Sequence, residues 1–285
     1  MKLIAKVCCT ALSVLAGLTG SSGVNAETQW RSVDSNNAVL MTLPHGKVVI
    51  ELAPQFSPKH VAQFSKLVAG GFYNNNKFYR VIDGFVAQGG PSEEATDAPE
   101  LNIEGEWKTN DAWAFAKVQD NDLFAEQTGF KDGFAIAYNP SEKAAWLAHC
   151  PGVLAMARGN EPNSASSHFY FTIGQAPRYL DRIMTVFGRV VYGMNNIQAI
   201  QRTQALEGEA AIPENDYTAI LDMKMMSAVP KAEQLQVEVE VTESKAFAEK
   251  VANRRARPEA FFYKKPPPVL DVCQVPVKSR LVKTK

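Results

Sequence analysis

Arg80 and Gln88 have the side-chain types needed for catalysis without a covalent intermediate. The guanidinium of Arg80 is always charged and presents its N–H groups in a rigid fork, and the amide of Gln88 can hold that fork in place. A fixed donor accelerates a reaction when it binds the transition state better than the ground state. From residue type alone, a structural ion pair between strands is the favoured role for Arg80, and only the motif described below favours a catalytic one.

Other reactive side chains do not form a convincing catalytic pattern. His149 precedes Cys150, but sequence neighbours normally diverge in direction and no third orienting residue is evident, so we do not expect a thiol nucleophile. The spacing of His45, His60, His149 and His168 does not match that of metal ligands, so we expect no metal.

Short strands dominate the region that carries Arg80 and Gln88. Apolar and β-branched runs between turn signals predict strands at 38–43, 47–52, 77–82, 85–88, 153–157, 169–173, 186–191 and 217–226. Ser57 and Pro58 predict the start of a helix that ends at Gly70 and Gly71, and a short helix is expected at 195–202. Many short strands with two helices indicate a β-barrel or a sandwich.

Two further segments lie outside this pattern. Residues 91–149 are irregular and rich in charge, Trp and Phe, with a turn between short strands at 129–134. After residue 227 we expect a half-buried strand at 234–241, a charged helix at 243–254 and a stiff Pro-rich spacer at 264–268. We expect the extension over 228–285 to lie against or beside the domain formed by residues 27–227.

The first 26 residues have the pattern of a secretory signal peptide. A basic start (Lys2 and Lys6), an apolar run over about 7–18 and a small-residue site ending at Ala26 predict export, to the periplasm if the host is Gram-negative. The mature chain would carry 28 basic and 30 acidic residues, a balance that argues against nucleic-acid binding. It has no other long apolar run, so no membrane insertion is expected. Its two cysteines, Cys150 and Cys273, are expected to pair in an oxidising compartment.

Three segments, in this order and spacing, resemble the cyclophilin signature. They are 78–90 (FYRVIDGFVAQGG), 152–158 with 163–170 (GVLAMAR and NSASSHFY), and 179–181 with 185–194 (YLD and TVFGRVVYGM). The resemblance covers roughly residues 36–226. It implies a mainly β fold, a closed eight-stranded antiparallel barrel capped by two helices, here with an insert at about 91–149 and a C-terminal extension.

The resemblance also assigns site residues. Arg80 falls on the family's catalytic arginine and Gln88 on the polar residue beside it. The implied substrate-binding residues are Tyr79, Phe85, Val86, Ala157, Arg158, His168, Tyr170, Tyr179 and Leu180. His168 stands where the family usually has Gln, Tyr179 where animal members often have Trp, and Tyr79 replaces a frequent His.

The implied activity is peptidyl-prolyl cis/trans isomerisation, without a cofactor, on proline-containing unfolded or exported polypeptides. The rim departures predict only weak binding of cyclosporin-like inhibitors. A scaffold that holds proline-containing segments without turnover is the main alternative. A hydrolase on a small barrel is the other, but no Ser-His-Asp pattern supports it.

Overall fold

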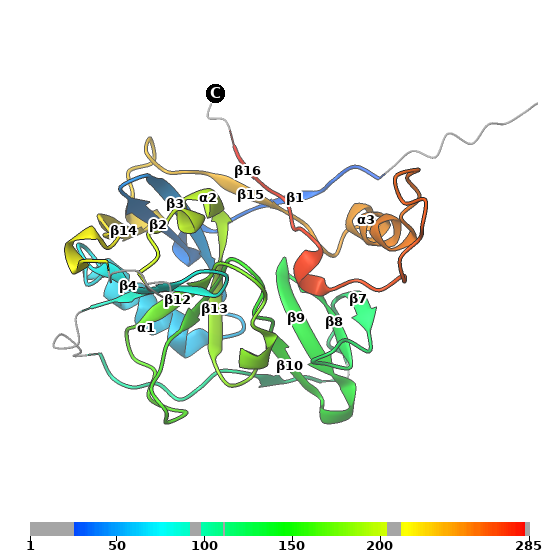
Figure 1. The fold of residues 1–285 in the computed structure, drawn as a ribbon, viewed down its shortest axis with the longest axis horizontal. Coiled ribbons are helices and arrows are strands. Elements are labelled where there is room, and N and C mark those ends of the chain that lie inside the picture. Colours follow the sequence, from blue (N-terminus) through cyan, green and yellow to red (C-terminus); the bar gives the residue numbers. More distant parts are fainter. Residues whose placement is uncertain (1–25, 92–97, 111, 204–211, 283–285) are drawn as a thin grey trace, which may run out of the picture.

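The strands of the described part of the chain form three antiparallel sheets (Figure 1). The computed structural model describes residues 26–91, 98–110, 112–203 and 212–282. The predicted signal peptide lies, apart from Ala26, outside these residues. In Figure 1 the largest sheet lies on the left, the second on the right, and the third runs across the top between them.

The largest sheet carries the predicted site. Its eight strands follow the order β14 (Asp222–Met225), β2 (Ala38–Leu43), β3 (Gly46–Leu52), β13 (Thr185–Tyr192), β11 (Val153–Met156), β12 (Phe169–Thr172), β5 (Val86–Gly90) and β4 (Lys77–Ile82). Its core is rich in aromatic rings in tilted and edge-to-face contact, among them Phe64, Phe78, Phe169 and Phe187.

The ladder is open between β4 and β14, so the predicted closed barrel is not confirmed. One isolated bridge, between Lys77 and Ala219, spans the gap, and the N–H of Phe78 donates to the carbonyl of Thr218 at 3.0 Å. The strand expected over 217–226 pairs as a ladder only in β14, four residues long. The coarser prediction of a mainly β cyclophilin fold with few helices is confirmed.

Helix α1 (Pro58–Ala69) covers one end of this sheet and begins and ends where the sequence predicts. Ser57 is at the N-cap position, but its hydroxyl donates to the carbonyl of Val186 instead of capping. The carboxylate of Glu104 takes that role and accepts the N–H groups of Lys59 and His60, which is the favoured place for a negative charge on a helix. Helix α2 (Met194–Gln198) is shorter than expected.

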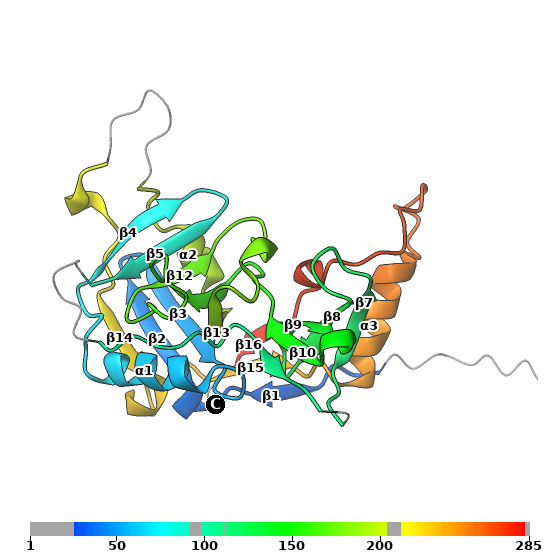
Figure 2. The same cartoon turned by 90° about the horizontal axis from the view of Figure 1, so that it is seen from below.

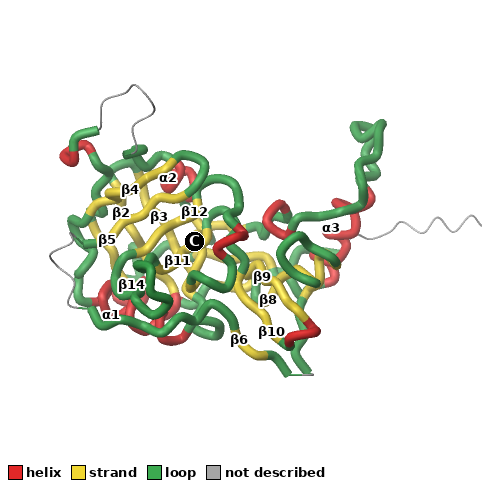
Figure 3. Tube along the Cα trace, turned by 60° about the horizontal axis from the view of Figure 1, so that its bottom comes forward, coloured by secondary structure: helices red, strands yellow, loops and turns green. Residues whose placement is uncertain are grey.

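The insert forms the second sheet, so the expectation of an irregular segment was wrong, but the turn between short strands expected at 129–134 is present as a hairpin in which Lys131 pairs with Phe134. Its strand order is β6 (Trp107–Lys108), β10 (Ala144–Leu147), β9 (Phe134–Asn139), β8 (Gln127–Lys131) and β7 (Ala116–Asp120). Figure 3 shows its strands as a separate yellow group beside the larger sheet. Several of its strands are short or polar. They are stabilised by pairing with neighbouring strands and by apolar residues that pack on them from a distant part of the sequence.

The C-terminal extension supplies these apolar residues. Helix α3 (Lys245–Ala256) packs on the insert, with the rings of Phe247 and Phe130 5.4 Å apart. The third sheet joins the chain's two ends, because β15 (Val237–Glu240) pairs with both β1 (Trp30–Ser32) and β16 (Ser279–Leu281). The extension therefore packs against the rest of the chain, as expected.

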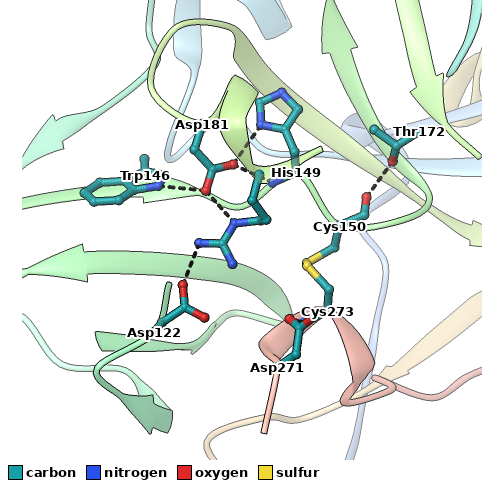
Figure 4. Close-up of a disulfide and its surroundings, with 9 residues drawn as sticks. Asp122, Trp146, His149, Cys150, Thr172, Asp181, Asp271 and Cys273 are labelled. Carbon is teal, nitrogen blue, oxygen red and sulfur yellow. Dashed lines mark hydrogen bonds and ion pairs between the residues drawn. A yellow bond between two sulfur atoms is a disulfide. The ribbon is translucent and has the colours of Figure 1, made fainter. Parts of the chain in front are cut away.

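A disulfide joins Cys150, just before β11, to Cys273 in the short helix η6 (Val272–Gln274), which confirms the predicted pairing (Figure 4). The two cysteines are 123 positions apart. Closing a loop of this order contributes up to about 4.7 kcal/mol in the chain-entropy model. It also leaves Cys150 without the free thiol that a nucleophile would need.

Candidate active site

Neighbouring strands of the large sheet place three of the predicted site residues in a row. Arg80 in β4 is paired with Gln88 in β5, and Tyr170 in β12 is paired with the same glutamine from the other side. Residues directly opposite each other in antiparallel strands share a face. The sheet therefore presents the cation, the amide and the ring toward one side.

A bulge in β4 adds Tyr79 to this group. The register shifts between Phe78 and Arg80, so β4 carries an extra residue at Tyr79, and a bulge of this kind redirects side chains. Gln88 accepts a hydrogen bond from Arg80 Nη1 at 3.2 Å and donates its Nε2 to the Tyr79 hydroxyl at 2.7 Å. The Tyr79 hydroxyl lies 2.8 Å from His168 Nδ1. Gln88 thus fixes Arg80 on one side and Tyr79 on the other.

The turn between β4 and β5 holds Phe85 through a close backbone approach. The N–H of Ile173 donates to the Phe85 carbonyl at 2.9 Å, and the N–H of Gln175 donates to the Gly84 carbonyl at 3.1 Å. A Cβ atom on Gly174 would lie 2.0 Å from the backbone of Gly84. Only glycine at position 174 allows the two segments to approach this closely.

A cavity of about 380 Å³ collects most of the predicted residues. Apolar residues form one part of its wall, and Arg80 and Gln88 are among its polar residues. Its lining residues are Arg80, Phe85, Val86, Gln88, Ala157, Arg158, Tyr170, Leu180 and Met184. Tyr179 does not line it; its exposed ring stacks on Phe85, with the ring centres 6.5 Å apart.

A second, larger cavity of about 670 Å³ adjoins the first and shares Gln88, Ala157 and Arg158 with it. Tyr79 and His168, the two remaining predicted residues, line this second space. The two cavities are therefore neighbours along the same groove residues, Gln88, Ala157 and Arg158.

Ala157 and Arg158 lie just beyond the end of β11 rather than within it. The N–H of Ala157 already donates to the His168 carbonyl at 2.8 Å, so it cannot also donate to a bound peptide. The guanidinium of Arg158 donates to the carbonyls of Ile183, Gly159 and Asn160. Arg158 therefore holds the loops at the edge of the groove.

Sequence reasoning missed a buried polar chain behind Tyr170. The Tyr170 hydroxyl lies 3.0 Å from His149 Nε2, and His149 Nδ1 lies 3.0 Å from the carboxylate of Asp181. Asp181 also accepts from the N–H of His149, from Trp146 Nε1 and from Arg178 Nε (Figure 4). The signal was present, since Asp181 belongs to the Tyr-Leu-Asp motif, but its partner His149 comes from the insert.

The charges of this chain follow from burial and pairing. Burial alone would raise the pKa of Asp181, but the hydrogen bond from His149 and the charge of Arg178 outweigh it and lower the pKa below the usual 3.8. Burial raises the pKa of Tyr170. Asp181 is therefore an anion and the Tyr170 hydroxyl is neutral near neutral pH.

Arg80 makes no ion pair with any residue that the structure describes; its side chain is exposed and bonded to Gln88. The structural alternative therefore has no partner in the described chain. Across the same residues, no group of three or more His, Cys, Asp or Glu side chains is arranged to hold a metal ion. Nor does any described helix have the length and apolar character needed to cross a membrane.

Comparison with known proteins places this groove in a family. The sequence model of the cyclophilin type peptidyl-prolyl cis-trans isomerase/CLD family matches residues 38–225. A probable peptidyl-prolyl cis-trans isomerase of Brucella suis biovar 1 (strain 1330) is 34% identical over 194 residues, covering 67% of this chain and 85% of that protein. The peptidyl-prolyl cis-trans isomerase CYP23 of Arabidopsis thaliana is 30% identical over 221 residues, covering 73% of this chain and 85% of the relative.

Among solved structures, the cyclophilin AquaCyp293 from Hirschia baltica superposes with a TM-score of 0.71 at 28% identity, over 90% of this chain and 94% of that one. That coverage exceeds the residues matched by the family model, so the likeness reaches beyond the part that the family model describes. The fold, the matched residues and the relatives agree, and the chain belongs to the cyclophilin-type peptidyl-prolyl cis-trans isomerase family.

Proposed function

We propose that the chain isomerises X-Pro bonds in exported polypeptides, with the proline ring in the 380 Å³ cavity and Arg80 as the catalytic donor. The observation that carries this proposal is the position of the Arg80 guanidinium. It lines the same cavity as Phe85, Val86, Tyr170 and Leu180, and Gln88 holds it from behind.

The chemistry needs a donor and an anchor. Rotation about an X-Pro bond breaks amide resonance, against a barrier of about 18–20 kcal/mol. The twisted amide has a localised lone pair on the proline nitrogen, which the planar amide lacks. A guanidinium aimed at that nitrogen therefore stabilises the transition state more than the ground state, while the apolar wall anchors the ring as the carbonyl side turns.

The size of the donor's contribution follows from its charge. A hydrogen bond to a charged group contributes roughly 1.5–3 kcal/mol, which corresponds to about one to two decades in rate. Gln88 supports this contribution because its oxygen accepts from Arg80 while its amide group is fixed by Tyr79. Anchoring and desolvation in the cavity supply the remainder of the acceleration.

Export is supported by two independent features. The leader over residues 1–26 has the charge and small-residue pattern of a signal peptide, and the disulfide between Cys150 and Cys273 is the kind that persists in oxidising compartments. The substrates would then be newly exported, unfolded chains, in the periplasm if the host is Gram-negative. The rim residues Tyr179 and His168 favour weak binding of cyclosporin-like inhibitors.

A proteolysis-coupled assay on a proline tetrapeptide tests the proposal with the mature chain 27–285. We expect an isomerisation rate proportional to enzyme concentration, above the uncatalysed rate with its time of tens to hundreds of seconds. Saturable peptide binding without acceleration would instead identify a holding scaffold. Ester hydrolysis by the same sample would point to the hydrolase alternative.

A further inference from the structure

The insert presents two large apolar side chains on the loop between β7 and β8, residues 121–126. Leu123 is 94% exposed and Phe124 is 46% exposed. Single exposed apolar residues are common on protein surfaces, but groups of them beside a cavity mark interaction sites. The surroundings of this loop therefore decide whether it has a role.

A buried arginine fastens the loop to the wall of the proline cavity. Arg178 begins the short helix η3 (Arg178–Leu180), whose last residue lines the cavity. Its guanidinium lies 3.3 Å from the carboxylate of Asp122 and 5.2 Å from the centre of the Phe124 ring. The loop is thus held in one position relative to the cavity, and the Asp122 charge is neutralised within the fold.

Two more exposed apolar residues belong to the segment that begins at Arg178 and contact residues of the cavity wall. Tyr179 follows Arg178 and stacks on Phe85, a residue of the cavity wall. Ile183 accepts a hydrogen bond at its carbonyl from Arg158, another wall residue. Leu123, Phe124, Tyr179 and Ile183 are all among the exposed large hydrophobic side chains, and we call them the apolar rim.

We propose that the apolar rim is a second contact surface for the substrate, binding apolar side chains of the same unfolded polypeptide whose proline occupies the cavity. This inference rests on the proposed function and extends it to the substrate class. An extended chain advances about 3.3–3.6 Å per residue, so residues flanking a bound proline leave the cavity within a few positions. Unfolded chains expose apolar side chains that folded proteins bury, and a tetrapeptide is too short to use the rim fully.

The test compares Leu123→Ser with the matched control Phe261→Ser. Both side chains are large, apolar and almost fully exposed, since Phe261 is 84% exposed, so neither change should affect folding. Phe261 lies in the loop after α3, which projects at the end of the molecule opposite β4 and β5 (Figure 2). Each variant is assayed for kcat/KM on a proline tetrapeptide and on the proline-limited refolding of a reduced, carboxymethylated protein.

We expect Leu123→Ser to keep its tetrapeptide kcat/KM within about twofold and to lose about fivefold on the refolding protein, the loss due to a leucine that is partly buried in the complex. Phe261→Ser should leave both values unchanged. An equal effect of both variants on refolding, or no effect of Leu123→Ser, would overturn the inference. Sedimentation velocity adds one more such outcome: a dimer lost only in Leu123→Ser would show that a second copy occupies the rim. A wild-type chain inactive on the tetrapeptide would refute the proposed function itself.

Discussion

Asp181→Asn tests the buried polar chain that supports the cavity. The change keeps the shape of the side chain and removes its charge. Asp181 accepts four hydrogen bonds, from the N–H and Nδ1 of His149, from Trp146 and from Arg178, and its side chain is almost fully buried. Arg178, equally buried, would keep only the carboxylate of Asp122 at 3.3 Å as its counter-charge.

Breaking a buried ion pair by removing one partner costs about 3–5 kcal/mol. Because Asp122 remains, we expect Asp181→Asn to lower the free energy of unfolding by about 3 kcal/mol, at the lower end of that range. The matched control is Glu238→Gln, which breaks the pair with Arg280 at 2.7 Å. Arg280 is 53% exposed, so this control should cost about 1 kcal/mol or less. Urea unfolding without reductant at pH 7 measures both values.

The difference between wild type and Asp181→Asn should also depend on pH. The pKa of Asp181 is lower in the folded chain than its ordinary 3.8, so the unfolded state takes up its proton first as pH falls. The stability that the charge contributes is complete above about pH 3.8 and is lost as pH falls through the folded-state pKa. A loss at pH 7 no larger than that of Glu238→Gln would refute the account of this chain.

Three further predictions concern the rest of the fold. Burial lowers the pKa of His60 from 6.5, although a hydrogen bond to Glu104 opposes the shift. The free energy of unfolding should therefore fall as pH drops below 6.5, by up to about 1.4 kcal/mol per pH unit. In urea titrations, His60→Gln should not show this dependence on pH. Cys150→Ser with Cys273→Ser should lower the free energy of unfolding by about 2–4 kcal/mol, and reductant should bring wild type to the same value. Deleting 228–285 should lower stability or solubility and leave tetrapeptide turnover largely intact, because none of its described residues, up to 282, lines either cavity; a folded truncation with little turnover would contradict this.

Sequence patterns predicted the helices and strands whose signals lie within the element itself. Helix α1 begins at Pro58 and ends before Gly70 as expected, and the strands that follow alternating apolar runs are present. Apart from the hairpin around residues 129–134, the insert sheet was not predicted, because strands such as Ala116–Asp120 contain few strand-forming residues. They are stabilised by pairing and by α3, which follows more than one hundred residues later.

Most of the predicted site residues line the two adjoining cavities, with Tyr179 outside them, whereas the buried residues that hold them in place were not predicted from the sequence. Arg80 and Gln88 lie eight residues apart on one hairpin, so a motif could relate them. His149 and Asp181 meet behind Tyr170 only because the insert folds against η3. Sequence reasoning weighed His149 only as a neighbour of Cys150 and as a possible metal ligand, and no spacing rule predicts a contact of this range.

The most direct test of the central claim is the tetrapeptide kcat/KM of Arg80→Ala. We expect a fall of about one to two decades, from the roughly 1.5–3 kcal/mol of a charged hydrogen bond, with little change in peptide binding. Arg80→Lys should not restore full activity, because an ammonium lacks the fork geometry. The control Arg202→Ala removes a guanidinium that pairs with Asp83 in the β4–β5 turn and should retain turnover.

Folding is checked in the same samples by urea unfolding. Because Arg80 is exposed and bonded only to Gln88 among the described residues, its replacement should change the free energy of unfolding by about 0.5 kcal/mol or less. The account predicts a folded Arg80→Ala enzyme with at most about a tenth of wild-type kcat/KM. A folded Arg80→Ala enzyme with near-wild-type turnover would contradict it.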